Sequence, residues 1–171
     1  ALAAGMSIRL YISCAIACPF DGPIAPAQVR AVADALGSLF EGAAAGERGE
    51  LDLGDTIGVA TPAQIEALLG AFDAGERAGL TLHLHDTFGR AGECVRAALA
   101  TGVRSFDGAA GGLGGCPYAS TPQRRAPGNI STESLIGAVR ASGFATHVDD
   151  AALAGAGEFA RSLLHGAEAG S

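Results

Sequence analysis

Two histidines one residue apart are the side chains in this sequence most suited to chemistry. His83 and His85 lie in or next to the apolar run of residues 80–84, which is typical of a buried strand. Side chains alternate between the two faces of a strand, so both imidazoles project to the same side. With Asp86 beside them and Asn129 on a later loop, these donors suit Mg²⁺ or Mn²⁺ better than a thiolate-bound zinc ion. Taken alone, the pair is explained equally well by two partly buried histidines with ordinary hydrogen bonds.

Further polar residues follow the ends of the predicted strands. In a parallel sheet, functional side chains gather at the carboxyl ends of the strands, so we expect the site at that edge. Nucleotide binding is disfavoured, because no Walker lysine motif is present and the glycines at 111–115 precede Cys-Pro instead of a helix start. The polar residues at or after strand ends are Asp55, Thr56, Asp86, Asp107 and Cys116.

The elements that must position these residues alternate between strand and helix. Apolar runs predict strands at residues 9–14, 50–53, 80–84 and 103–106, the second of them ending at Gly54. Helical spacing predicts helices after each strand, and a final helix capped by Asp149 or Asp150. This alternation indicates an α/β protein with a mostly parallel sheet. The predicted helices cover residues 26–40, a segment after Thr61 with Pro62 in its first turn, residues 90–100 with Gly102 at the end, a segment from about Ser131, and a last one through Leu164.

The composition bounds the fold and the partners. The 171 residues are 49% hydrophobic, with a mean hydropathy of +0.30, which predicts one globular domain over residues 1–171. A net charge of −7 disfavours nucleic acid and anionic membrane surfaces as partners. No apolar run approaches the length of a membrane span, and the four scattered cysteines favour a reducing compartment. We therefore expect a cytoplasmic protein, or a mitochondrial matrix protein in a eukaryote, that is not secreted.

Five segments occur together in an order that identifies a family. The chain resembles 3-hydroxy-3-methylglutaryl-CoA (HMG-CoA) lyases from about residue 9 to residue 142. Related condensing enzymes, the isopropylmalate and homocitrate synthases, usually carry H-x-H-N-D at the histidines and lack the glycine-rich cysteine loop, so a lyase is preferred. The segments are Y-I-S-C-A-I-A-C-P-F at 11–20, L-G-D-T-I-G-V-A-T-P at 53–62, H-L-H-D-T-F-G at 83–89, G-G-L-G-G-C-P-Y-A at 111–119 and G-N at 128–129.

The resemblance implies a fold and a metal site. The family has a (β/α)₈ TIM barrel, of which this chain would form about four C-terminal β/α units, or half a barrel. His83 and His85 would ligate the divalent cation, Mg²⁺ or Mn²⁺, and Asn129 would supply a further ligand. The reaction implied is the retro-Claisen cleavage of HMG-CoA to acetyl-CoA and acetoacetate, with an acyl-CoA as the substrate partner.

The resemblance also implies residues that contact the substrate. Cys116 corresponds to the catalytic cysteine of the family, and its glycine-rich surroundings suit a mobile loop that carries a proton donor. His83 would assist the proton transfer besides ligating the metal. Asp55 and Thr56 would line the substrate site or hold its loops.

The missing half of the barrel leaves three interpretations open. The family's Arg-Asp pair lies on the first strand, and no Arg-Asp dipeptide occurs in this chain. The chain is therefore an active lyase completed by a partner or a second copy, a degenerate half barrel that binds metal or acyl-CoA without turnover, or an assembly module. Four open strands predict two exposed edges and an apolar inner face, so we expect a homodimer or larger assembly.

Overall fold

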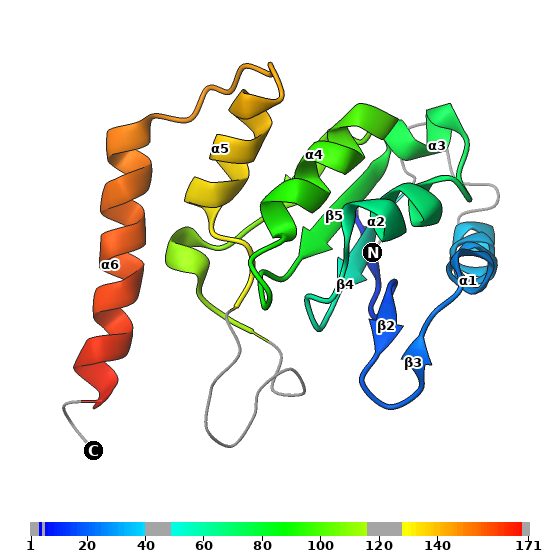
Figure 1. Ribbon diagram of the computed structural model, residues 1–171, viewed down its shortest axis with the longest axis horizontal. Helices are drawn as coiled ribbons and strands as arrows, with labels where there is room; N and C mark the ends of the chain where they lie inside the picture. The colour runs from blue at the N-terminus through cyan, green and yellow to red at the C-terminus, as the bar shows by residue number, and fades with distance from the viewer. Residues whose placement is uncertain (1–3, 5, 40–48, 116–127, 169–171) are drawn as a thin grey trace.

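A four-stranded parallel sheet forms the centre of the protein. The computed structural model describes residues 4, 6–39, 49–115 and 128–168 (Figure 1). The strand order is β1-β4-β5-β6, and each neighbouring pair is parallel. A separate short hairpin pairs β2 with β3. The strands are β1 (Arg9–Ile12), β2 (Ala17–Cys18), β3 (Gly22–Pro23), β4 (Glu50–Asp55), β5 (Leu80–Leu84) and β6 (Ser105–Asp107).

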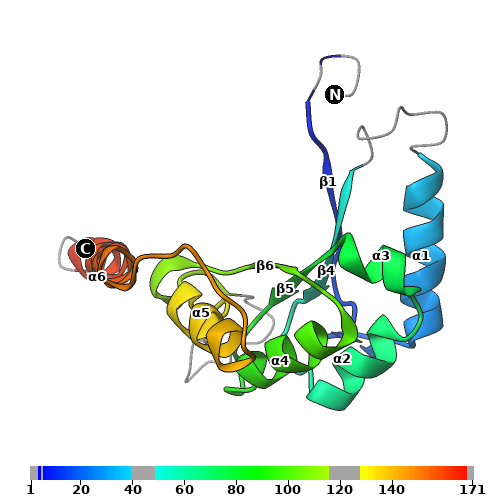
Figure 2. The same ribbon diagram turned by 90° about the horizontal axis from the view of Figure 1, so that it is seen from above.

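Helices follow the strands and pack on one face of this sheet, which leaves its other face open (Figure 2). Contacts between α1 and α2, α2 and α4, and α4 and α5 make a continuous outer layer. The last helix, α6, packs against the 3₁₀ turn η2 and α5 at one end of the molecule. No helix in the described part of the chain is long and apolar enough to cross a membrane. The helices are α1 (Pro26–Ser38), α2 (Pro62–Leu69), α3 (Ala74–Ala78), α4 (Ala91–Thr101), η2 (Ala110–Gly112), α5 (Thr132–Ala141) and α6 (Asp150–Glu168).

Local capping chemistry sets most helix boundaries where the sequence predicts them. The Thr61 hydroxyl accepts a hydrogen bond from the Gln64 amide, with Pro62 in the first turn of α2. Ser131 caps α5 in the same way, and Asp149 accepts from the Ala152 amide at the start of α6. Gly102 ends α4 at φ 110°, a left-handed conformation that glycine adopts without strain.

Several boundaries and two elements differ from the prediction; β1 and α1, for example, each end two residues earlier than expected. Strand β4 continues through Gly54 to Asp55, because it is paired on both sides and Gly54 lies opposite His83 in β5. Strand β6 begins at Ser105, two residues later than expected. The β2–β3 hairpin and α3 were not predicted. Five residues are too few for helical periodicity, and α3 depends on the reciprocal capping of Asp73 and Glu76.

The hydrophobic core lies between the sheet and the helices. Leu53, Leu82 and Leu84 point from the strands into this layer, where each is at most 2% exposed. Ile65 and Val95, on α2 and α4, meet them from the other side and are equally buried. Side chains alternate between the two faces of a strand. Because the leucines point toward the helices, the residues between them must project from the other face of the sheet, which the helices leave open.

The open face of the sheet is polar, so the expectation of an apolar inner face is wrong. Leucines alternate with polar residues along β4 and β5, and burying the leucines under the helices places the polar set on the other side. No described element covers this face as the helices cover the opposite one. Its residues are Arg9, Tyr11, Glu50, Asp52, Thr81, His83, Ser105 and Asp107.

Candidate functional site

His83 and His85 converge at the carboxyl end of the sheet, as their spacing predicts. Their Nε2 atoms are 3.1 Å apart, and the ring centroids are 5.1 Å apart in an edge-to-face arrangement. His83 Nδ1 is 2.6 Å from Asp107 Oδ1, so the carboxylate accepts the Nδ1 proton. His85 is 8% exposed, and its Nδ1 has no hydrogen-bond partner within the described ranges.

Asn129 reaches the histidines through backbone pairing. Residues 128–130 run along the end of β5, where Asn129 forms an antiparallel bridge with His85. The Ile130 amide donates to the Leu84 carbonyl at 2.9 Å. The Asn129 side chain is also a hydrogen-bond partner of His83 and raises the pKa of that imidazole. The structure therefore brings together the three predicted metal ligands, although 44 residues separate Asn129 from His85 in the sequence.

Close packing of glycines fixes the position of Asn129. A Cβ atom at Gly128 would lie 2.0 Å from the Gly114 carbonyl oxygen and 2.6 Å from that of Gly112. The Asn129 Nδ2 donates to the Leu113 carbonyl at 3.0 Å, and a Cβ at Gly114 would approach that nitrogen to 2.9 Å. The glycine-rich segment thus lies against the proposed ligand at a distance that only glycine permits.

The two histidines are driven toward different protonation states. The hydrogen bond to Asp107 raises the pKa of His83, and this effect outweighs burial. Burial lowers the pKa of His85, and the charge of His83 lowers it further. Burial opposes the charge on Asp107, but the hydrogen bond and charge of His83 together leave the pKa of that carboxyl below its ordinary value. His83 therefore holds its proton more tightly than His85, and a cation at His83 would compete with that proton.

A divalent cation fits these donors. Two nitrogens that are bound about 2.1 Å from one cation and at right angles to each other lie about 3.0 Å apart. The Nε2 atoms of His83 and His85 are separated by nearly that distance. When no cation is bound, these two nitrogens share a hydrogen bond instead. Among the described residues no three His, Cys, Asp or Glu side chains converge on such a point. If a cation is held here, a third protein ligand would have to be the Asn129 amide or a residue outside the described ranges.

Below the histidines, the open face holds charged residues that the prediction did not single out. Arg9 contacts Glu50 at 2.7 Å, Asp107 at 3.2 Å and Asp52 at 3.6 Å. Asp52 is fully buried, and neither of its carboxylate oxygens has a hydrogen-bond partner among the described residues. The sequence does contain a signal for these residues, because Arg9 and Asp52 alternate with leucines inside predicted strands. Charged residues inside apolar strands rarely lack a function or a partner.

The buried Asp52 makes stability depend on pH. Burial and then the charge of Asp107 raise the pKa of Asp52 to about 6. The folded protein then binds this proton more tightly than the unfolded chain, so the contribution of Asp52 to stability is largest below about pH 4 and is lost as the pH rises through 6. We expect Asp52→Asn to raise the free energy of unfolding at pH 7 by roughly 1–3 kcal/mol, and by much less at pH 4. Urea unfolding at both pH values measures this, and a gain that is equal at both would contradict it.

Asp55 and Thr56 make contacts that hold loops. The Asp55 carboxylate is buried and accepts hydrogen bonds from the Val59 and Ala60 amides at 3.1 and 2.9 Å. The Thr56 hydroxyl accepts from the Cys14 amide at 2.8 Å. Asp86 likewise accepts from the Ala91 amide, at the first turn of α4. These bonds brace the loops at the carboxyl edge of the sheet, and contact of Asp55 or Thr56 with substrate stays a prediction. Cys116 lies outside the described residues.

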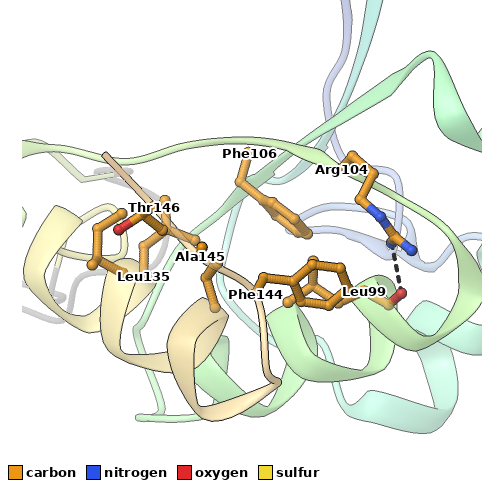
Figure 3. Close-up of a pocket in the computed structure, with 9 residues that line it drawn as sticks. Leu99, Arg104, Phe106, Leu135, Phe144, Ala145 and Thr146 are labelled. Carbon is orange, nitrogen blue, oxygen red and sulfur yellow. Dashed lines mark hydrogen bonds between the residues drawn. The ribbon is translucent and has the colours of Figure 1, made fainter. Parts of the chain in front are cut away.

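One cavity in the described part of the protein lies away from the histidines. A cavity of about 320 Å³ opens between α4, α5 and β6 (Figure 3). Phe106 lines the cavity from the face of β6 opposite to that of Asp107. The Arg104 guanidinium lies 4.7 Å from the centre of the Phe144 ring. It also donates a hydrogen bond to the Leu99 carbonyl. The lining is mainly apolar and no two of its residues suggest acid–base or metal chemistry. This cavity therefore adds no candidate groups to those of the open sheet face.

Comparison with known sequences agrees with the resemblance. The HMGL-like family model matches residues 4–159. The mitochondrial hydroxymethylglutaryl-CoA lyase of Rattus norvegicus is 41% identical over 160 residues, which make up 93% of this chain and 46% of the relative. The chain thus spans about half the length of the curated relatives that it matches.

Solved structures give the same family and the fold. The hydroxymethylglutaryl-CoA lyase of Pseudomonas aeruginosa matches with a TM-score of 0.82 and 37% identity, covering 95% of this chain and 51% of its own. The HMG-CoA lyase of Acinetobacter baumannii, solved in complex with coenzyme A and 3-methylmalate, matches with a TM-score of 0.77 and 33% identity over 96% of this chain and 50% of its own. The four parallel β/α units are therefore part of a TIM barrel. By its sequence and its fold, this chain belongs to the HMGL-like family.

Proposed function

We propose that this chain carries the metal-binding part of a lyase that cleaves HMG-CoA to acetyl-CoA and acetoacetate. The observation that carries the proposal is the convergence of His83, His85 and Asn129 at the carboxyl edge of a parallel sheet, in a member of the HMGL-like family. Coenzyme A in the A. baumannii relative supports an acyl-CoA as the substrate class. The donor set of two imidazoles and an amide oxygen suits Mg²⁺ or Mn²⁺.

The cleavage needs groups that move protons and hold the substrate. The tertiary hydroxyl loses its proton, the bond between C2 and C3 breaks, and C2 gains a proton to become the methyl group of acetyl-CoA. When bound, the cation would polarise the hydroxyl and carboxylate oxygens of the substrate and lower the pKa of the hydroxyl. His83, His85 and Asn129 would hold that cation, His83 would also assist the proton transfer, and Cys116 delivers the proton to C2. Asp55 and Thr56 hold the loops that border the substrate.

Release of acetyl-CoA from HMG-CoA tests this function. The chain is assayed with Mg²⁺ or Mn²⁺, with excess chelator, and as His83→Ala and His147→Ala variants, because His147 is exposed and distant from the site in the sequence. Turnover that requires both the metal and His83, but not His147, is the expected result. Turnover that persists in chelator or in His83→Ala would contradict the proposed role of the histidines.

Binding without turnover is the second candidate, and a specific observation favours it. The chain has no Arg-Asp dipeptide, the pair that the family resemblance places at the metal and at the enolate. Metal affinity with no acetyl-CoA release, even at high protein concentration, is the expected result for this candidate. An assembly module would show neither metal binding nor turnover.

Cysteine reactivity tests the proposed role of Cys116. We expect a thiol reagent to label Cys116 faster than Cys14 or Cys94 in the folded protein, because a proton donor to substrate must be accessible. Cys94 is 1% exposed, and burial raises its pKa to about 12, so it provides an unreactive internal reference. Mass spectrometry of peptides after timed labelling gives the three rates. Labelling of Cys116 as slow as that of Cys94 would favour a closed structural loop.

We also propose that the chain associates with itself or with a partner that completes the barrel. In the described sheet, β1 and β6 each have one unpaired edge, and unpaired edges favour association. We expect light scattering to report a dimer or larger species at micromolar concentration. A monodisperse monomer that remains stable would contradict this expectation.

A further inference from the structure

We propose that Arg9 is a positioning residue for His83, acting through Asp107. The inference rests on the proposed function, in which His83 is a metal ligand. Imidazole ligands are commonly oriented by a carboxylate on their second nitrogen, and that carboxylate is in turn held by hydrogen bonds. In this protein a guanidinium from the far edge of the sheet holds the carboxylate.

The Asp107 carboxylate is shared between the two residues. Its Oδ1 is 2.6 Å from His83 Nδ1, and its Oδ2 accepts from Arg9 Nη1 at 3.2 Å. The two oxygens thus face His83 and Arg9 respectively, and the rotation that satisfies Arg9 also aims Oδ1 at the imidazole. Since Arg9 is on β1 and Asp107 is on β6, this contact spans the whole order of the sheet.

The guanidinium is fixed by contacts of its own. Arg9 pairs with the Glu50 carboxylate at 2.7 Å and donates to the Tyr11 hydroxyl at 3.5 Å. Glu50 is in turn hydrogen-bonded to Thr81 and Ser105 on the next two strands. Arg9 thus belongs to a hydrogen-bond network that reaches every strand of the sheet. These contacts hold the guanidinium in one position, with Nη1 directed at Asp107.

The buried Asp52 explains why the positive charge of the Arg9 guanidinium is needed next to Asp107. Its buried carboxylate has no hydrogen-bond partner in the described ranges and lies 3.6 Å from Arg9 Nη1. The charge of Asp107 also acts on it. Without the guanidinium beside them, these two carboxylates, when both are ionised, would repel each other in a poorly solvated place. Repulsion would turn Asp107 away from Asp52, and its Oδ1 would lose its alignment with His83.

The position of the ring proton of His83 is the direct test. Long-range ¹H–¹⁵N correlation spectra of the metal-free protein at alkaline pH report which imidazole nitrogen carries the proton. We expect the Nδ1–H tautomer of His83 in the wild type and a mixture of tautomers in Arg9→Met. Asp107→Ala should show the largest change, and it is the reference for complete loss of the carboxylate contact. A His83 spectrum in Arg9→Met that is identical to wild type would overturn the proposal.

Arg30 provides a matched control. Its side chain is 34% exposed, against 35% for Arg9, and it pairs with two carboxylates, those of Asp34 and Glu76, where Arg9 pairs with three. It lies on α1, on the helical face of the sheet. Arg30→Met loses a comparable set of ion pairs, so a general loss of stability would appear in both variants. Only Arg9→Met should change the His83 spectrum.

Metal affinity provides the second readout and separates this proposal from the proposed function. We expect Arg9→Met to weaken Mn²⁺ binding about tenfold in calorimetry, Arg9→Lys to recover part of the loss, and Arg30→Met to match the wild type. If Arg9→Met does not fold, Arg9→Lys still tests the tautomer, because one ammonium cannot reproduce the fork of the guanidinium. If the wild type binds no metal, the proposed function fails, and the His83 spectrum still decides the role of Arg9.

Discussion

Replacement of His83 by alanine is expected to lower the affinity for Mg²⁺ or Mn²⁺ at least about tenfold, or about 1.4 kcal/mol of binding free energy. The reason is geometric, because His83 Nε2 and His85 Nε2 lie 3.1 Å apart and one nitrogen cannot replace the pair. Titration calorimetry at pH 8 is the measurement. At lower pH the raised pKa of His83 makes the cation compete with a proton, so wild-type affinity should also fall as the pH is lowered.

His147→Ala is the control for that experiment. His147 is exposed, in the segment between α5 and α6, so its loss tests whether histidines bind the cation without a built site. We expect this variant to bind like the wild type. Binding isotherms that are the same for His83→Ala and the wild type would leave two hydrogen-bonded histidines and no metal site.

Gly128→Ala is expected to destabilise the fold by at least about 2 kcal/mol, near the upper range for adding one methyl group to a packed interior. The new Cβ would lie 2.0 Å from the Gly114 carbonyl oxygen and 2.6 Å from that of Gly112. These contacts are with backbone, so the glycine-rich segment or Asn129 has to move. Thermal unfolding should show a fall in Tm of about 4–8 °C for a chain of this size, and metal affinity should fall because Asn129 is displaced.

Gly137→Ala is a control with the opposite expected sign. Gly137 is exposed inside α5, and a Cβ there would meet nothing within 4 Å. Alanine is the better helix former, so this variant should be more stable by about 0.5–1 kcal/mol. Equal Tm values for wild type and Gly128→Ala would show that the glycine-rich segment is not packed as described.

The local sequence determined the elements and the histidine pair. Apolar spacing along Leu80–Leu84 and the cap at Thr61 act within a few residues, so strand β5 and the start of α2 follow from their own segments. The alternation of side chains on a strand put His83 and His85 on one face without any knowledge of the fold. The shared motifs also indicated the family and the half barrel, which the comparisons confirmed.

Only the tertiary structure decided which distant groups meet those histidines. Asn129 reaches His85 because residues 128–130 pair with the end of β5, and Arg9 reaches Asp107 across the order of the sheet. The polarity of the open face followed from the side on which the helices cover the leucines. Such contacts depend on the order of the strands and on which face of the sheet is covered. A local sequence pattern reflects interactions between residues that are close in the chain, so it carries no information about either. The contacts described here join residues 44 to 98 positions apart.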